Sequence, residues 1–261
     1  MITAGIDVGV ETVKAVVLRD GSIAGYGKAL SGGATRAMSA ELAYANALQM
    51  AGLSAADISK TVATGKGKYD VTFADDRITE PICAANAAKY YNPESTCAVD
   101  VGADETLALT MGETKHIEQF VLNEACAAGI GCFIKHIAKR LDLTLEEISE
   151  ISPPAQGASR LNAACAVFAE LDALDLLNNG VPPKEVAAAI LDAAAVRVSA
   201  VINDITFPSF EVSLLFGGLS KNKAFVKALE SYSGISFTIP ENSEYAGALG
   251  AALFAVDGVI A

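Results

Sequence analysis

Two copies of a short motif, an aspartate followed two residues later by glycine, have the residue types that bind phosphate. Asp7-Val8-Gly9 and Asp100-Val101-Gly102 each come at the end of an apolar stretch. The glycine lets the backbone approach a phosphate, and the aspartate can hold a water of Mg²⁺. Lys14, shortly after Gly9, can reach the same phosphates as a point charge. A single Asp-Val-Gly is an ordinary strand end, but its repetition favours a phosphate site.

Cys126 and Cys165 each stand at the start of an expected helical stretch. A helix N-terminus lowers the pKa of a thiol, and its amides and dipole favour an anionic cluster. A cubane iron–sulfur cluster takes four thiolates, so two cysteines per chain fit one only when a second chain supplies the other two. Burial as small apolar side chains is the alternative that the residues leave open. Cys83 and Cys97 are expected in the core, whereas Cys132 either packs or tunes such a cluster.

The two Asp-x-Gly motifs belong to an internal repeat. Residues 4–9 resemble residues 97–102, and each segment is followed by two further strand candidates, at 13–18 and 22–29 or at 106–111 and 115–122. Helical patterns are expected at 36–52, 80–91, 128–141, 146–151, 164–178, 183–204 and 246–256, and one more strand at 211–216. Two hairpin-rich units of this kind predict a duplicated α/β domain.

No linker rich in proline, glycine or serine separates the two halves, so we expect two subdomains packed around a cleft. The expected boundaries are 1–94 for subdomain I and 95–245 for subdomain II, which carries Cys126 and Cys165. Residues 246–261 are expected to form a C-terminal helix that packs back on the cleft.

Two glycine-rich segments could serve the same cleft. Gly217-Gly218 follows a strand candidate and precedes a helix, where exposed amides and a backbone without side chains suit a nucleoside. Gly247 and Gly250 lie in a helix of small residues, and a ligand or a neighbouring helix would explain them equally well.

Composition narrows the class of protein. The chain has 261 residues, of which 52% are hydrophobic, and a net charge of −12. This length suits two compact domains with a large core. Scattered acidic residues repel nucleic acid, whose binding needs clustered lysine and arginine. The sequence has neither an apolar run of about 18 residues nor the basic head of a signal peptide, so we expect a cytoplasmic protein that binds no membrane.

In order along the chain, these motifs resemble the superfamily of acetate kinases, sugar kinases, heat-shock ATPases and actin. One branch is indicated by three further segments, Ala63-Thr64-Gly65-x-Gly67, Cys126-Ala-Ala-Gly129-x-Gly131-x-Phe133 and Cys165-Ala-Val-Phe-Ala-Glu170. That branch contains the activators of 2-hydroxyacyl-CoA dehydratases and the ATPase subunits of benzoyl-CoA reductase. The two cysteine motifs are the most specific part of the resemblance, which covers essentially the whole chain.

The resemblance implies a duplicated actin-like (ribonuclease H-like) ATPase fold with two subdomains around a nucleotide cleft. Asp7, Asp100 and Glu105 would be catalytic. ATP or ADP and Mg²⁺ would be bound by Gly9, Thr12, Lys14, Gly102, Asp104, Gly217, Gly218 and Gly247. Cys126 and Cys165 would bind a [4Fe-4S] cluster, one per dimer.

The partners implied by the resemblance follow from electron transfer. A homodimer, or a heterodimer with a paralogous subunit, would receive one electron from a ferredoxin- or flavodoxin-like donor. ATP would drive the delivery of that electron to an acyl-CoA dehydratase or to a benzoyl-CoA reductase-type partner.

Both phosphate loops depart from the family pattern. Val10 and Glu11 replace the usual hydroxyl residue, for which Thr12 is a shifted substitute, and Ala103-Asp104 replaces Gly-Gln. Two alternatives therefore stay open. The first is a cluster-bearing subunit of the benzoyl-CoA reductase kind, with weak or no ATPase activity of its own. The second is a small-molecule kinase of the same fold, with Asp104 or Glu105 as its base.

Overall fold

The computed structural model describes residues 1–32, 35–112, 116–123, 129–152, 161–162, 165–205 and 212–257. The chain divides into two compact units. Unit 1 comprises Met1–Ala98, Met111–Glu118 and Glu244–Ala261, and unit 2 comprises Val99–Thr110 and Gln119–Ser243. Among the described residues, no helix combines the length and the apolar character needed to cross a bilayer.

Unit 1 is built on a five-stranded sheet with the order β3-β2-β1-β4-β5. Strands β1, β2 and β3 form an antiparallel meander, whereas β4 runs parallel to β1 and β5 parallel to β4. The strands span Ile2–Val8 (β1), Thr12–Arg19 (β2), Ser22–Leu30 (β3), Lys60–Thr64 (β4) and Asp76–Arg77 (β5). Parallel pairing of β1 with β4 brings the end of β4 beside the end of β1, where Asp7 lies opposite Thr64.

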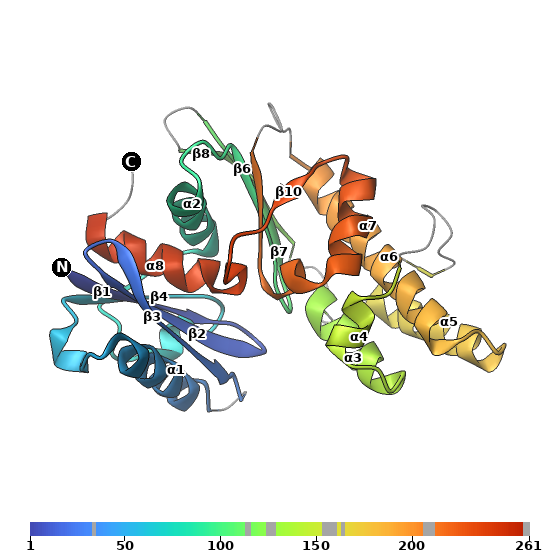
Figure 1. The fold of residues 1–261 in the computed structure, drawn as a ribbon, viewed down its shortest axis with the longest axis horizontal. Coiled ribbons are helices and arrows are strands. Elements are labelled where there is room, and N and C mark those ends of the chain that lie inside the picture. The colour runs from blue at the N-terminus through green and yellow to red at the C-terminus, as the bar shows by residue number, and fades with distance from the viewer. Residues whose placement is uncertain are drawn as a thin grey trace. The chain divides into compact units, whose positions relative to one another are not determined.

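Two helices cover opposite faces of this sheet, α1 (Arg36–Ala51) and α8 (Ala246–Asp257) (Figure 1). Each lies close to the strands because the strands carry glycine at the contact. A Cβ atom at Gly27 of β3 would overlap the Ala43 carbonyl of α1, and one at Gly5 of β1 would overlap the Ala248 carbonyl of α8. Asp7 shares the α8 face with Gly5, because alternate residues of a strand point the same way.

Helix α2 (Glu80–Tyr91) packs on the outer side of α8. The two helices approach closely because Gly250 lies against the backbone carbonyl of Cys83. Unit 1 is completed by the short 3₁₀ helices η2 (Ala55–Asp57) and η3 (Lys68–Asp70).

Unit 2 is built around a second five-stranded sheet with the order β10-β9-β6-β7-β8. Its strands are β6 (Cys97–Val101), β7 (Thr106–Met111), β8 (Ile117–Asn123), β9 (Ser213–Phe216) and β10 (Phe237–Thr238). Its helices are α3 (Ile130–Arg140), α4 (Leu145–Ser149), α5 (Ala166–Asn178), α6 (Pro183–Asn203), η4 (Gly218–Lys221) and α7 (Lys223–Ser233). The short helix η5 (Ser243–Tyr245) begins at the last residue of unit 2 and ends in unit 1.

The core of unit 2 joins the sheet to these helices. Helix α3 contributes one apolar face with helical spacing, which includes Phe133, Ile134 and Ile137. Ala169 and Ala173 of α5 belong to the same buried cluster, as does much of α6. The predicted mixed α/β class with a repeated strand–turn–strand unit is therefore confirmed, with one five-stranded sheet built around each copy.

Candidate functional site

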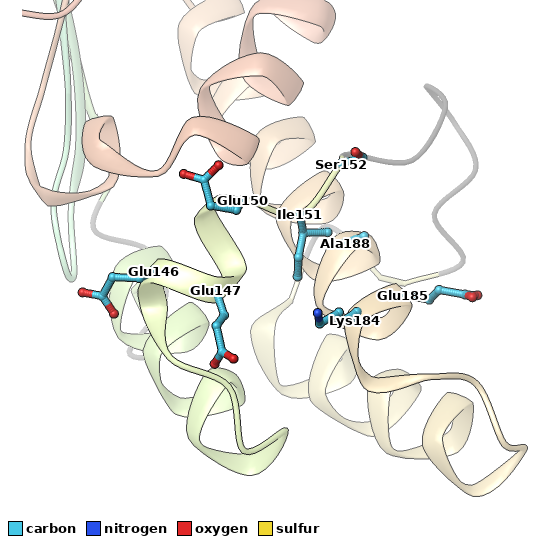
Figure 2. Close-up of a pocket in the computed structure, with 8 residues that line it drawn as sticks. All are labelled: Glu146, Glu147, Glu150, Ile151, Ser152, Lys184, Glu185 and Ala188. Carbon is cyan, nitrogen blue, oxygen red and sulfur yellow. The ribbon is translucent and has the colours of Figure 1, made fainter.

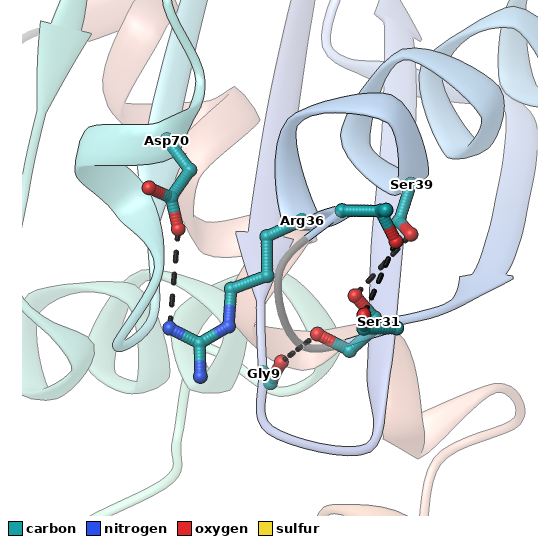
Figure 3. A network of polar contacts seen from close by, with 7 residues as sticks. Gly9, Ser31, Arg36, Ser39 and Asp70 are labelled. Atoms are coloured by element: carbon teal, nitrogen blue, oxygen red, sulfur yellow. Dashed lines mark hydrogen bonds and ion pairs between the residues drawn. The ribbon is translucent and has the colours of Figure 1, made fainter.

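The first Asp-x-Gly motif ends in a tight turn that joins β1 to β2. The Gly9 N–H donates to the Thr12 carbonyl at 3.1 Å, which closes the turn. Ser31 makes two hydrogen bonds to the turn. Its hydroxyl donates to the Gly9 carbonyl at 2.8 Å, and its N–H donates to the Glu11 carbonyl at 3.0 Å. Ser39 in turn donates to the Ser31 carbonyl (Figure 3). These hydrogen bonds connect the turn to the residue that follows β3 and, through Ser39, to α1.

Asp7 stands directly opposite Lys14 in the β1–β2 register. Lys14 Nζ lies 3.8 Å from Asp7 Oδ2, and the two side chains are only 16% and 18% exposed. Burial raises the pKa of the Asp7 carboxyl, Lys14 partly offsets this, and the nearby Glu80 carboxylate adds to the rise. A bound divalent cation would lower that pKa again, which suits a metal-binding role.

Glycines stand next to both oxygens of the Asp7 carboxylate. Gly65, directly after β4, has a φ of +85°, and a Cβ atom there would lie 2.6 Å from Asp7 Oδ1. Gly247, in the first turn of α8, would place a Cβ atom 3.0 Å from Asp7 Oδ2. Neither glycine places a side chain against the carboxylate, as an aspartate that holds a water of Mg²⁺ would require. Gly250 has a different role, because it serves the packing of α8 on α2.

A second ion pair near Asp7 was not predicted from the sequence. Lys68 Nζ lies 3.4 Å from Glu80 Oε1, and both side chains are largely buried. Lys68 begins η3 just after the glycine turn that follows β4. No local pattern in the sequence points to this pair, because Lys68 and Glu80 lie on separate elements.

Unit 2 repeats this geometry around Asp100. The Gly102 N–H donates to the Glu105 carbonyl at 2.9 Å, so Gly102–Glu105 forms the same turn as Gly9–Thr12. Gly217, directly after β9, has a φ of +86°, and a Cβ atom there would lie 2.5 Å from Asp100 Oδ1. Gly217 is thus the counterpart of Gly65. The internal repeat of the sequence therefore corresponds to the same three-dimensional arrangement of turn and glycine around each aspartate.

The two copies differ at one functional position. Equivalent residues are 93 positions apart, so Leu107 occupies the place of Lys14. Leu107 is 4% exposed and belongs to the strand β7. The lysine that pairs with the first aspartate therefore has no equivalent at this position in the second copy. Gly218 begins η4, and a Cβ atom there would meet open space. Asp104 and Glu105 lie in the Gly102–Glu105 turn.

Helix α3 begins against the second turn. The Cys132 N–H donates to the Ala103 carbonyl at 2.9 Å. A Cβ atom at Gly129 would overlap Asp104 Cα, and one at Gly131 would lie 2.7 Å from the Gly102 carbonyl oxygen. The glycines that flank Ile130 in the sequence motif are therefore required for the contact between this helix and the turn.

Of the two predicted cluster ligands, the structure describes Cys165, whereas Cys126 lies outside the described residues. Cys165 is the half-buried N-cap residue of α5, and its N–H donates to Asn162 Oδ1 at 3.1 Å. Cys83 and Cys97 are fully buried, as expected, and burial raises the pKa of the Cys83 thiol. Cys132 is partly buried in α3.

The position of Cys165 at the start of α5 determines what surrounds its thiol. The first-turn amides of α5 are next to it, and its side chain makes no capping hydrogen bond. In the part of the chain that the structure describes, no three His, Cys, Asp or Glu side chains gather into a complete metal site.

A cavity of about 650 Å³ in unit 2 has a different character (Figure 2). It lies between α4 and the start of α6. Its lining is formed by Glu146, Glu147, Glu150, Ile151, Ser152, Lys184, Glu185 and Ala188. Four carboxylates against one ammonium would repel the phosphates of a nucleotide, so we do not assign the nucleotide to this cavity.

Comparisons with known proteins agree with the geometry. The pattern of the BadF/BadG/BcrA/BcrD ATPase family matches residues 4–255. The activator of lactoyl-CoA dehydratase from Anaerotignum propionicum is 32% identical over 98% of both chains. A benzoyl-CoA reductase subunit from Thauera aromatica is 30% identical, over 97% of this chain and 92% of its own length.

A solved structure shows the same fold at full length. The activator of the 2-hydroxyisocaproyl-CoA dehydratase from Clostridium difficile, with bound ADPNP, superposes with a TM-score of 0.89. Its sequence is 29% identical, and the match covers 99% of this chain and 96% of that one. The resemblance inferred from the motifs is confirmed: the chain belongs to the BadF/BadG/BcrA/BcrD ATPase family.

Proposed function

We propose that this protein is an ATP-dependent one-electron donor that activates an acyl-CoA dehydratase or reductase. The observation that carries the proposal is the pair of equivalent turns, Gly9–Thr12 and Gly102–Glu105, each beside an aspartate and a glycine with positive φ. Turns of this kind suit the phosphates and Mg²⁺ of a nucleotide. Membership of an ATPase family supports ATP as that nucleotide.

In unit 1, Asp7 would hold a water of Mg²⁺ and Lys14 would neutralise phosphate charge. Their separation of 3.8 Å is longer than a charge-assisted hydrogen bond, so a phosphate could be a closer partner of the Lys14 ammonium. Gly9, Thr12 and Gly247 would let the nucleotide approach, since none presents a bulky side chain to it.

In unit 2, Asp100 and Glu105 would be the carboxylates that position Mg²⁺ and the attacking water. Gly102 and Asp104 lie in the turn. The backbone of Gly217 and Gly218 would lie against the nucleoside. The working subdomains would be residues 1–94 and residues 95–245, followed by the C-terminal helix 246–261.

Cys126 and Cys165 would hold a [4Fe-4S] cluster, together with the same two cysteines of a second chain. When bound, this cluster supplies one-electron redox chemistry at low potential. The role of the protein is to place the Cys165 thiolate at the N-terminus of α5, where amides and helix dipole stabilise negative charge.

The proposed electron acceptor follows from the relatives, and the proposed donor from the one-electron chemistry of the cluster. One relative is an activator of lactoyl-CoA dehydratase and another is a subunit of benzoyl-CoA reductase. We therefore propose an acyl-CoA dehydratase or reductase as electron acceptor, a ferredoxin- or flavodoxin-like protein as donor, and the cytoplasm as the place where they meet. The dimer is formed with an identical chain or with a paralogue.

A second candidate is favoured by the altered loops. Glu11 puts a carboxylate in the first turn and Asp104 puts one in the second, where both would repel a triphosphate. A chain of this kind can carry the cluster while a paralogue hydrolyses ATP, as a non-hydrolytic member of a heteromer of the benzoyl-CoA reductase kind. The third alternative, a small-molecule kinase, has only the shared fold in its support.

Nucleotide binding and phosphate release by the isolated protein test the proposal. Asp7→Ala and Asp100→Ala should each lower ATP turnover by at least about a hundredfold, as expected when a group that organises charge in the transition state is lost. Asp20→Ala, in the exposed turn between β2 and β3, is the control and should turn over ATP at the wild-type rate. Wild-type turnover by the Asp7→Ala variant would refute the site, and tight ATP binding without hydrolysis would favour the non-hydrolytic subunit.

A further inference from the structure

Helix α3 carries concentrated positive charge on an acidic protein. Lys135, Lys139 and Arg140 belong to this helix, which contains no carboxylate, whereas the whole chain has a net charge of −12. The next helix, α4, has the opposite composition, because it contains two glutamates and no cation. The charge of the surface therefore changes sign between two consecutive helices of unit 2.

The cations of α3 lie on its solvent-facing side. The other side is buried, with Phe133 and Ile134 in the core of unit 2. Lys135 and Lys139 are both exposed, and residues four positions apart are neighbours on a helix surface. We call the surface formed by Lys135, Lys139 and Arg140 the basic face of α3.

One edge of the basic face borders the helix that begins after Cys165. Arg140 Nε lies 3.0 Å from Glu170 Oε1 of α5, and these side chains are 49% and 26% exposed. Cys165 is the N-cap of α5, five residues before Glu170. Five residues of helix rise about 7 Å. A protein bound to the basic face would therefore lie near the end of α5 at which the proposed cluster is held.

Helix stability explains only part of this charge. Lys139 and Arg140 are in the last turn of α3, where positive charge stabilises the helix dipole. Lys135 is in the middle of the helix, and the dipole effect falls off within the last turn. Like charges four residues apart also destabilise a helix slightly. Attraction of a negatively charged partner would explain why Lys135 and Lys139 occur together.

We propose that the basic face of α3 is the docking surface for an acidic redox protein, the donor of the electron. The inference deepens the proposed function and rests on it, because the partner is the ferredoxin- or flavodoxin-like donor. The cations of α3 attract an acidic surface and the glutamates of α4 repel it, so the partner is steered to α3.

The size of the basic face suits a transient partner. Helix α3 has 11 residues and is therefore about 16 Å long. Weak electron-transfer encounters bury the smallest areas among specific protein complexes. A donor that binds, delivers one electron and leaves needs only such a small charged surface.

Association with an acidic bacterial ferredoxin tests the surface apart from any redox step. The association rate constant is measured by biolayer interferometry at ionic strengths of about 0.01 M and about 1 M, where the Debye length is about 30 Å and about 3 Å. The test variant combines Lys135→Glu with Lys139→Glu. The control combines Lys184→Glu with Lys227→Glu, two exposed lysines of α6 and α7, and changes the net charge equally.

At low ionic strength the α3 variant should associate at least about tenfold more slowly than wild type, as expected when electrostatic steering is lost. The control should stay within about twofold of wild type, and all three proteins should associate at similar rates at high ionic strength. Lysine and glutamate have similar helix propensities, so circular dichroism should show an unchanged fold.

Reduction of the anaerobically purified protein provides a second readout. The ferredoxin should reduce the α3 variant more slowly by the same factor as it associates. Reduced methyl viologen, a small cation that needs no docking surface, should reduce the variant at least as fast as wild type.

The docking surface is overturned if the α3 variant associates with ferredoxin as wild type does, or if the control loses as much. Binding of anionic lipid vesicles through Lys135 and Lys139, without binding of ferredoxin, would also overturn it. Wild-type protein that purifies anaerobically without a cluster would overturn the proposed function instead, while the association rates would still decide the docking surface.

Discussion

Replacement of Gly247 by alanine should weaken Mg·ATP binding without harming the fold. The glycine lies in the first turn of α8, where a Cβ atom would be 3.0 Å from Asp7 Oδ2 and 3.1 Å from Asp7 Cγ. Alanine is favoured over glycine in a helix by up to about 1 kcal/mol, so the free energy of unfolding should stay the same or rise. The added methyl group would displace one hydrogen-bonded partner of the Asp7 carboxylate. A hydrogen bond to a charged group contributes about 1.5–3 kcal/mol. The Kd for Mg·ATP should therefore rise roughly 10- to 150-fold.

Gly250→Ala provides the comparison, with the same substitution in the same helix. Its Cβ atom would overlap the Cys83 carbonyl, so it should destabilise unit 1 by about 1–3 kcal/mol through overpacking of α8 on α2. Calorimetric titration of both variants with Mg·ATP gives the Kd, and thermal denaturation gives the loss of stability. A Gly247→Ala variant that binds Mg·ATP as wild type does, or that loses as much stability as Gly250→Ala, would refute a place for Gly247 beside the bound nucleotide.

Two further predictions concern Asp7 and Gly217. Burial raises the pKa of Asp7 above its usual 3.8, so the folded state holds the proton more tightly and loses stability as pH rises through the raised pKa. Asp7→Asn should therefore raise the Tm of the nucleotide-free protein at about pH 7 and change it little near pH 3; a lower Tm at pH 7 would contradict this. Gly217→Ala should cost about 2–4 kcal/mol in urea denaturation, because the strain of a φ of +86° with a ψ of 174° adds to overlap with the Val101 carbonyl. Gly234→Ala, at a φ of +69° with open space, should cost only the strain, and equal losses would argue against the contact.

The sequence was most informative where local pattern and chemistry coincide. Asp7 and Asp100 could be found because each ends an apolar strand and is followed by the same tight turn, and such turns are encoded by adjacent residues. The mixed α/β class followed from the same repeat. Cys83 and Cys97 were correctly expected in the core, because each lies within an apolar element.

Features that depend on distant segments could not be predicted. Gly65 and Gly217 resemble each other only through their positive φ and the aspartate beside them, and that aspartate comes from another strand. Lys68 pairs with Glu80 through the placement of η3 against α2, which periodicity does not encode. The sequence also left Gly247 and Gly250 equivalent, whereas the structure puts one against a carboxylate and the other against a helix backbone.

Iron bound to the anaerobically purified protein is the most direct test of the electron-transfer role. We expect about four irons and four sulfides per dimer, all lost in Cys126→Ala and in Cys165→Ala, because a cubane requires all four thiolates. Cys97→Ala, a change at a fully buried thiol in β6, should keep the iron. Iron-free wild-type protein, or a full complement of iron in Cys165→Ala, would contradict the account and leave a nucleotide-binding protein without a cluster.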